Sequence, residues 1–141
     1  KSGKDSEYTT EDPQNQDVFS SHILYVEDNP VLRKLVKSML PQLNITTVAT
    51  AEQALLLTEQ QSFDILLIDI NLGSGMDGIE LAKKLRDTSQ YGKTRMIAIT
   101  AYSLDQIELA GGVGVFNHYV SKPFSQQDLT QAIQLNKVAK V

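Results

Sequence analysis

The feature that most constrains this fold is a regular alternation of short strand-like runs with longer amphipathic segments. Five runs rich in apolar or β-branched residues recur, at residues 23–26, 45–48, 65–68, 96–99 and 119–120. Five segments with helical spacing follow them, at residues 30–40, 51–61, 79–86, 103–109 and 125–138. Because parallel strands need a crossover that is usually a helix, the alternation predicts an α/β fold with a parallel sheet covered on both faces.

Capping and breaking residues delimit the first predicted helix. Asn29 or Asp28 is expected to cap it, Pro30 suits its first turn, and Pro41 ends it. Apolar residues at helical spacing predict the side that packs on the sheet. These residues are Val31, Leu32, Leu35, Val36 and Leu40 in the first helix, and Leu129, Ile133 and Leu135 in the last.

Composition restricts the classes of protein to consider. The 141 residues suit one domain, and the 41% that are hydrophobic are enough to form a core. No apolar run approaches the roughly 20 residues that cross a bilayer, so no membrane span is predicted. A net charge of −4 disfavours direct binding to nucleic acid. The absence of cysteine excludes disulfides and zinc–thiolate sites.

The first 21 residues differ in composition from the rest of the chain. They are mostly polar, so they bury too little apolar surface to offset the entropy of ordering. Residues 1–21 are therefore expected to be a flexible linker or tail, and residues 22–141 the domain. A chain that starts at Lys1 is expected to be a fragment of a longer protein, although residues 1–3 are equally open to being a remnant of recombinant expression.

Charged or chemically reactive side chains follow four of the five predicted strands. Glu27 and Asp28 follow the first, Asp69 the third, Thr100 the fourth and Lys122 the fifth. The carboxyl ends of parallel strands lie at one edge of the sheet, where ligands bind. These side chains, although distant in sequence, are therefore expected to meet in one crevice.

The chemistry of that crevice requires a cation. Three carboxylates repel one another strongly at close range unless a counter-charge is present. Oxygen ligands favour a hard ion, and Mg2+ suits a few carboxylates together with phosphate oxygens. Lys122 adds a compact positive charge and Thr100 a hydroxyl donor. The set predicts phosphoryl transfer to a carboxylate, with Asp69 as the nucleophile because it ends the most apolar strand.

Five motifs occur in order along the chain, and they read ILYVEDNP, ILLIDINL, MDG, MIAITA and YVSKPF. Together they resemble the receiver domain of two-component signalling. The resemblance covers the chain from about His22 to Val138 and implies a flavodoxin-like (βα)5 fold with strand order 2-1-3-4-5.

The resemblance also assigns a metal site and a phosphorylation site. Asp69 matches the phosphoacceptor, and Asp28 the direct Mg2+ ligand. Glu27 matches the acidic neighbour that reaches the metal through water. Asn71 matches the position whose backbone carbonyl binds the metal, and Asp69 itself is a further ligand.

Three further positions match the family's switch. Lys122 matches the lysine beside the phosphoryl group, and Thr100 the switch hydroxyl. Tyr119 matches an aromatic residue that turns inward when Thr100 moves towards the phosphate, although an aromatic residue here is also open to simple packing. The Lys122–Pro123 peptide bond is expected to be cis, as it is in the family.

Two segments depart from the family pattern. The loop at residues 70–78 is one residue longer than usual, with Gly73 where proline often stands, and is similar to loops of receivers attached to hybrid histidine kinases. The glycine-rich stretch at residues 111–116 makes the end of the fourth helix and its partner surface hard to predict.

The function implied is that of a phosphoacceptor fed by a phosphohistidine on a histidine kinase or a histidine phosphotransfer protein. Phosphorylation would shift a two-state equilibrium, which a downstream protein reads at the face of helix 103–109 and strand 119–120. The domain would catalyse its own phosphorylation and dephosphorylation. We expect it to be the C-terminal receiver of a hybrid sensor kinase and cytoplasmic, including as the cytoplasmic part of a membrane-bound kinase.

Two rival functions remain open. A Mg2+-dependent phosphohydrolase also forms an aspartyl phosphate, but the haloacid-dehalogenase type has a second acidic residue two positions after the nucleophile, where this chain has Asn71. A pseudo-receiver would be a binding module without phosphorylation, but all the acidic, hydroxyl and lysine positions are present. His22 and His118 are not expected to carry phosphoryl groups.

Overall fold

The computed structural model describes residues 20–73 and 75–139, with side chains as far as residue 134. The linker predicted at residues 1–21 therefore lies outside the described residues, apart from Ser20 and Ser21. The side chain of Leu135 also lies outside them. Within the described part of the chain, no helix is long and apolar enough to span a membrane.

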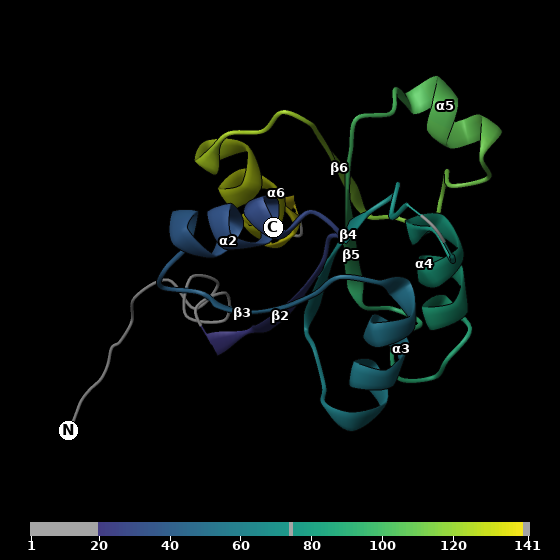
Figure 1. Ribbon diagram of the computed structural model, residues 1–141, viewed down its shortest axis with the longest axis horizontal. Coiled ribbons are helices and arrows are strands. Elements are labelled where there is room, and N and C mark those ends of the chain that lie inside the picture. Colours follow the sequence, from purple (N-terminus) through teal and green to yellow (C-terminus); the bar gives the residue numbers. More distant parts are fainter. Residues whose placement is uncertain (1–19, 74, 140–141) are drawn as a thin grey trace.

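A single parallel sheet of five strands forms the centre of the molecule (Figure 1). The strand order is β3-β2-β4-β5-β6, which is order 2-1-3-4-5 along the chain, as predicted. The strands are β2 (His22–Val26), β3 (Asn44–Val48), β4 (Ile65–Asp69), β5 (Arg95–Thr100) and β6 (His118–Ser121). The strand order reverses between β2 and β4, which is the point where a doubly wound sheet forms its ligand crevice.

The helices α2 to α6 of the described residues cover both faces of the sheet (Figure 1). The first layer is α2 (Pro30–Met39) with α6 (Gln126–Ala139). The second layer is α3 (Ala51–Gln60), α4 (Gly78–Arg86) and α5 (Leu104–Leu109). The sheet is therefore the middle layer of three, and each of its faces contributes to a separate apolar core.

Central strand β4 explains why the third apolar run is continuous. Successive side chains of a strand point to opposite faces, so a strand covered on both sides needs apolar residues throughout. Ile65 and Leu67 pack in the core under α2 and α6, whereas Leu66 and Ile68 pack under α3, α4 and α5. This burial fixes the position of Asp69 at the end of the strand.

Helix α2 buries a narrower stripe than predicted. Asn29 is its N-cap, with its side chain accepting from the backbone N–H of Val31 at 2.9 Å. Val36 and Leu40 are buried, but Val31 is 70% exposed and Leu35 is 41% exposed. Val31 and Leu35 therefore do not belong to the buried side of the helix, although their helical spacing is compatible with it.

Helix α4 begins in close contact with the end of β4. The backbone N–H of Gly78 donates to the carbonyl of Ile70 at 2.8 Å. A Cβ atom at Gly78 would overlap the carbonyl oxygen of Asp69 and lie 2.8 Å from the Cα atom of Ile70. Both neighbours are backbone atoms, so only glycine lets the helix start here without moving the strand that carries Asp69.

Gly78→Ala is therefore expected to lower the free energy of unfolding by about 3 kcal/mol. Gly114→Ala is the control, because Gly114 has φ +88° but no atom within 4 Å of its Cβ position. It should cost only the backbone preference, about 1 kcal/mol. Urea denaturation measures both, and equal costs would contradict the close approach at Gly78.

Candidate functional site

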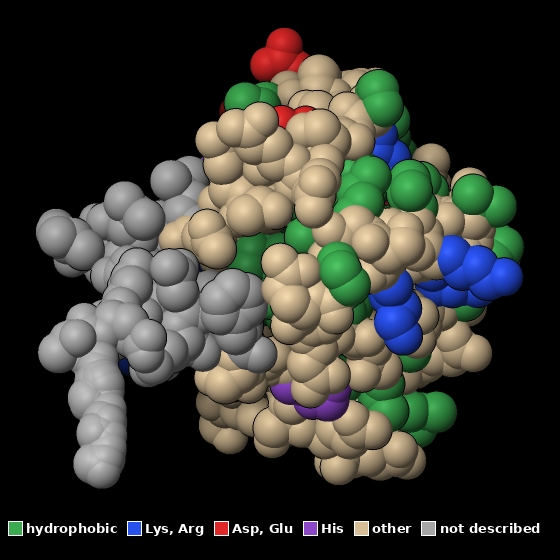
Figure 2. Space-filling model, turned by 90° about the vertical axis from the view of Figure 1, so that its left-hand side faces the viewer, with side chains coloured by type: hydrophobic (Ala, Val, Ile, Leu, Met, Phe, Trp, Pro, Cys, Tyr) green, Lys and Arg blue, Asp and Glu red, His purple; other side chains and the backbone are tan. Residues whose placement is uncertain are grey.

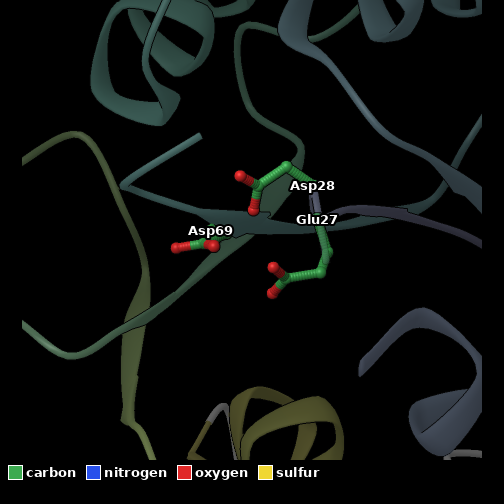
Figure 3. A group of neighbouring side chains, drawn as sticks. All are labelled: Glu27, Asp28 and Asp69. Atoms are coloured by element: carbon green, nitrogen blue, oxygen red, sulfur yellow. The ribbon is translucent and has the colours of Figure 1, made fainter. Parts of the chain in front are cut away.

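The carboxyl edge of the sheet brings the predicted acidic residues together. Glu27 and Asp28 follow β2, and Asp69 ends the neighbouring strand β4. Each residue offers one carboxylate oxygen within 4.8 Å of those of the other two (Figure 3). Glu27 and Asp69 are buried while Asp28 is exposed, so the cluster opens to solvent on the Asp28 side. The crevice around it is lined by Glu27, Asp28, Asn29, Leu32, Asp69, Asn71, Gly73, Ala101, Tyr102 and Lys122.

Lys122 lies between the two buried carboxylates. Its Nζ atom is 3.0 Å from Oδ2 of Asp69 and 3.0 Å from Oε1 of Glu27. The sequence predicted a positive charge from Lys122 in this crevice, but not its contact with Glu27. The predicted cis bond between Lys122 and Pro123 is present. One ammonium group therefore serves two carboxylates that would otherwise repel each other.

Glu27 is surrounded by hydrogen-bond donors. Besides Lys122, the hydroxyl of Tyr25 donates to Oε1 at 3.0 Å, and the backbone N–H of Asn29 donates to Oε2 at 3.1 Å. Tyr25 was not identified from the sequence as part of the site. Its spacing of two from Glu27 was the available signal, because residues i and i+2 of a strand share a face.

The two buried carboxyls differ in their affinity for a proton. Burial disfavours the charge of Glu27, but the hydrogen bonds from Lys122, Asn29 and Tyr25, with the charge of Lys122, hold its pKa below the usual value. Burial raises the pKa of Asp69 to about 7, with the charge of Glu27 adding to the effect and Lys122 opposing it. Burial alone would lower the pKa of Lys122, but its two carboxylate partners raise it.

Asn71 lies next to Asp69 at the mouth of the crevice. Its backbone N–H donates to Oδ1 of Asp69 at 3.1 Å, and its own Oδ1 accepts from Gly73 N–H at 3.3 Å. Every candidate metal ligand here is an oxygen atom, and one of the carboxylates reaches solvent. The residues therefore suit a hard divalent cation such as Mg2+. The set fits the predicted metal site.

Thr100 and Tyr119 do not line the crevice. Thr100 is buried at the end of β5, and its Oγ1 accepts from the backbone N–H of Tyr102 at 2.9 Å. Tyr119 is half-buried, with its hydroxyl donating to the carbonyl of Gly112 at 3.3 Å and its ring edge-on to Phe116. Their role as a switch stays a prediction.

The fold and the site together define a class of protein, a flavodoxin-like α/β domain with carboxylates and a lysine at the carboxyl edge of its sheet. The chain belongs to the response regulator receiver domain family, whose model matches residues 23–134. The resemblance inferred from the five motifs is therefore confirmed.

Several relatives resemble this chain over most of its length. Chemotaxis protein CheY of Pseudomonas aeruginosa is 35% identical over 116 residues, which cover 79% of this chain and 92% of that protein. The receiver domain of sensor histidine kinase PA1611 from Pseudomonas aeruginosa, solved with a magnesium ion in its active site cleft, has a TM-score of 0.73 and 30% identity, covering 82% of this chain and 95% of that one. Response regulator TrrA from Thermotoga maritima, solved with Mg2+ and BeF, has a TM-score of 0.70 and 29% identity, covering 85% and 97%.

The raised pKa of Asp69 predicts that the stability of the metal-free protein depends on pH. The carboxyl has a pKa of 3.8 in its ordinary state and about 7 in the fold. The folded protein thus keeps a proton that the unfolded chain releases between these values. The free energy of unfolding should therefore fall as the pH rises from about 4 to about 7, by up to about 4 kcal/mol from this group.

Asp69→Asn should flatten this decline, because the amide does not titrate. Urea denaturation in EDTA across this pH range measures the effect. Asp105→Asn, the same acid-to-amide change at an exposed position on α5, is the control for the substitution itself. If the free energy of unfolding of Asp69→Asn fell with pH as much as that of the wild type, the raised pKa would not belong to Asp69.

Proposed function

We propose that this domain accepts a phosphoryl group on Asp69 from a phosphohistidine of a histidine kinase or a histidine phosphotransfer protein. The observation that carries the proposal is the contact of the buried Asp69 carboxylate with Lys122, beside a carboxylate that reaches solvent. A carboxylate held in this way lines a crevice that opens to solvent beside Asp28 and is supported by the positive charge of Lys122.

The residues that would hold Mg2+ are Asp28, Asp69 and the backbone carbonyl of Asn71. When bound, Mg2+ neutralises the negative charge of the transferring phosphoryl group. Glu27 already accepts from three donors, so its place in this arrangement is that of a neighbour acting through water. The magnesium ion in the cleft of the related PA1611 receiver domain supports this proposal.

The chemical step requires little from the protein beyond position and charge. An oxygen of Asp69 forms the new bond to phosphorus as the nitrogen–phosphorus bond of the donor breaks, and the donor imidazole leaves. Lys122 would move from the Asp69 carboxylate to an oxygen of the phosphoryl group. Thr100, at the end of the adjacent strand, would donate a hydrogen bond from its hydroxyl to another oxygen.

The response to phosphorylation would reach a downstream protein through α5 and β6. Movement of Thr100 towards the phosphoryl group would vacate space for Tyr119 and replace its hydrogen bond to Gly112. On this side of the molecule Leu104, Leu109 and Val113 are largely exposed, which suits a surface for protein binding.

A second surface adjoins the crevice and would receive the phosphoryl donor. An apolar hollow between α2 and the start of α6 is lined by Leu32, Leu35, Ala101, Lys122, Pro123 and Phe124. Leu32, Ala101 and Lys122 also line the acidic crevice, so the two hollows are continuous. Figure 2 looks onto the α2 and α6 side and shows hydrophobic side chains at the surface there. A donor helix that packs on this hollow would hold its phosphohistidine next to Asp69.

The wider context is also a proposal. The long loop after Asp69 and the likeness to a receiver domain of a sensor histidine kinase both favour an origin in a hybrid kinase with a cytoplasmic receiver. Residues 1–21 would then be the linker that joins it to the preceding part.

The direct test of the proposed function is phosphorylation by a small donor. With phosphoramidate and Mg2+, the wild-type chain should gain one phosphoryl group, detected by intact-protein mass spectrometry. Asp69→Asn should gain none, and Asp28→Ala should be labelled at least about tenfold more slowly because the metal site is damaged. Asp105→Asn should be labelled normally.

Other results of this test favour the rival functions. Sustained release of phosphate, rather than one group per chain, would favour a phosphohydrolase. No labelling of the wild-type chain would favour a binding module without phosphorylation. Labelling that persists in Asp69→Asn would place the phosphoacceptor elsewhere.

The donor surface predicts a variant that separates two kinds of donor. Leu35→Arg should reduce labelling by a phosphorylated histidine phosphotransfer protein by about tenfold, because it puts a charge in the apolar hollow. Labelling by phosphoramidate should not change, because this small donor needs no docking surface. Leu56→Arg is the control, since Leu56 is also an exposed leucine, but on α3 and away from this hollow. Equal effects of the two variants on the protein donor would contradict the proposed surface.

A further inference from the structure

Tyr25 stands out among the core residues because its hydroxyl reaches the functional site. Its side chain is fully buried in the core between the sheet and helices α2 and α6. A phenylalanine would fill the same space, so packing does not require the hydroxyl. The hydroxyl donates to Oε1 of Glu27 at 3.0 Å, a buried bond between two residues of the same strand end.

The same oxygen of Glu27 also accepts from Lys122. The Nζ atom lies 3.0 Å from Oε1, while Oε2 accepts from the backbone N–H of Asn29 at 3.1 Å. A carboxylate oxygen has two lone-pair sites, so Tyr25 and Lys122 together occupy both sites of Oε1. Tyr25 and Lys122 therefore share one acceptor oxygen of Glu27.

We infer that Tyr25 is a positioning residue for Lys122, acting through Glu27. A buried carboxylate requires donors, and each donor it has weakens its hold on the others. With the Tyr25 hydroxyl in place, Lys122 stays shared between Glu27 and Asp69. Without it, Glu27 loses one of the two donors to its Oε1 atom, so it holds Lys122 more strongly and draws the ammonium group away from Asp69.

The functional consequence of this inference rests on the proposed function. Without the Tyr25 hydroxyl, Lys122 would be less available to a phosphoryl group on Asp69. The hydroxyl has no direct contact with that group. Its effect should therefore appear in the binding of a phosphoryl group and much less in the binding of the metal alone.

The first test measures the link between Tyr25 and Lys122 in the metal-free protein. In a double-mutant cycle of Tyr25→Phe and Lys122→Met, the unfolding equilibrium constant of the double variant should differ about tenfold from the product of the two single effects. The coupling arises because both substitutions remove a donor from the same oxygen. This result depends on neither Mg2+ nor phosphorylation.

Tyr91→Phe is the matched control for this cycle. Tyr91 is a second buried tyrosine, whose hydroxyl donates to the carbonyls of Thr58 and Gln61. In the cycle of Tyr91→Phe with Lys122→Met, the unfolding equilibrium constant of the double variant should agree within about twofold with the product of the two single effects. The same independence in the Tyr25 cycle would overturn the inference.

The second test measures the functional consequence with beryllofluoride as the phosphoryl probe. Because the chain has no tryptophan, amide NMR spectra are a suitable readout. At saturating Mg2+, Tyr25→Phe should weaken beryllofluoride binding by about tenfold, while Mg2+ affinity without the probe should change by less than about twofold. Tyr91→Phe should change neither.

Each other outcome of the second test has a definite meaning. Unchanged binding of both would make Tyr25 a packing residue and overturn the inference. An equal loss for both would place its effect at the metal site rather than at Lys122, and would also overturn it. No response of the wild-type chain to the probe would refute the proposed function instead, while the cycle still decides the link to Lys122.

Discussion

The contact of the Lys122 ammonium with the carboxylates of Glu27 and Asp69 is the interaction on which the site depends. A parallel sheet with acidic residues at the ends of adjacent strands places like charges side by side, which is unfavourable without a counter-charge. Lys122 supplies this charge from the far end of the chain at 3.0 Å from each partner. The topology makes the contact possible, because the carboxyl ends of β2, β4 and β6 lie at one edge.

The two buried carboxylates differ in how strongly their surroundings stabilise the charged form. Glu27 has donors from Tyr25, Asn29 and Lys122, and these keep it charged. Asp69 has fewer donors and is more weakly held in its charged form, so its pKa is raised to about 7. A carboxylate with a fixed charge, next to one whose charge is less stabilised and is shared with Lys122, is a suitable arrangement for binding a cation and then a phosphoryl group.

Much of this arrangement could be predicted from the sequence because it follows from periodicity and topology. The continuous apolar run before Asp69 indicated a central strand, and strand alternation placed Asp69, Asp28 and Lys122 at one edge. The features that could not be predicted depend on how each helix sits on the sheet and on the direction in which side chains point. Spacing alone did not separate the buried Val36 from the exposed Leu35. The bonds from Tyr25 and Lys122 to Glu27 likewise depend on how three side chains turn within one core.

A titration of the isotopically labelled protein with Mg2+, followed by amide NMR, tests the central claim most directly. If the carboxylates form one cation site next to Lys122, the first signals to shift should be those of Asp28, Asp69 and Asn71, with a single saturating curve. Shifts that start at acidic residues elsewhere, or signals at this edge of the sheet that stay unchanged at saturation, would contradict the account.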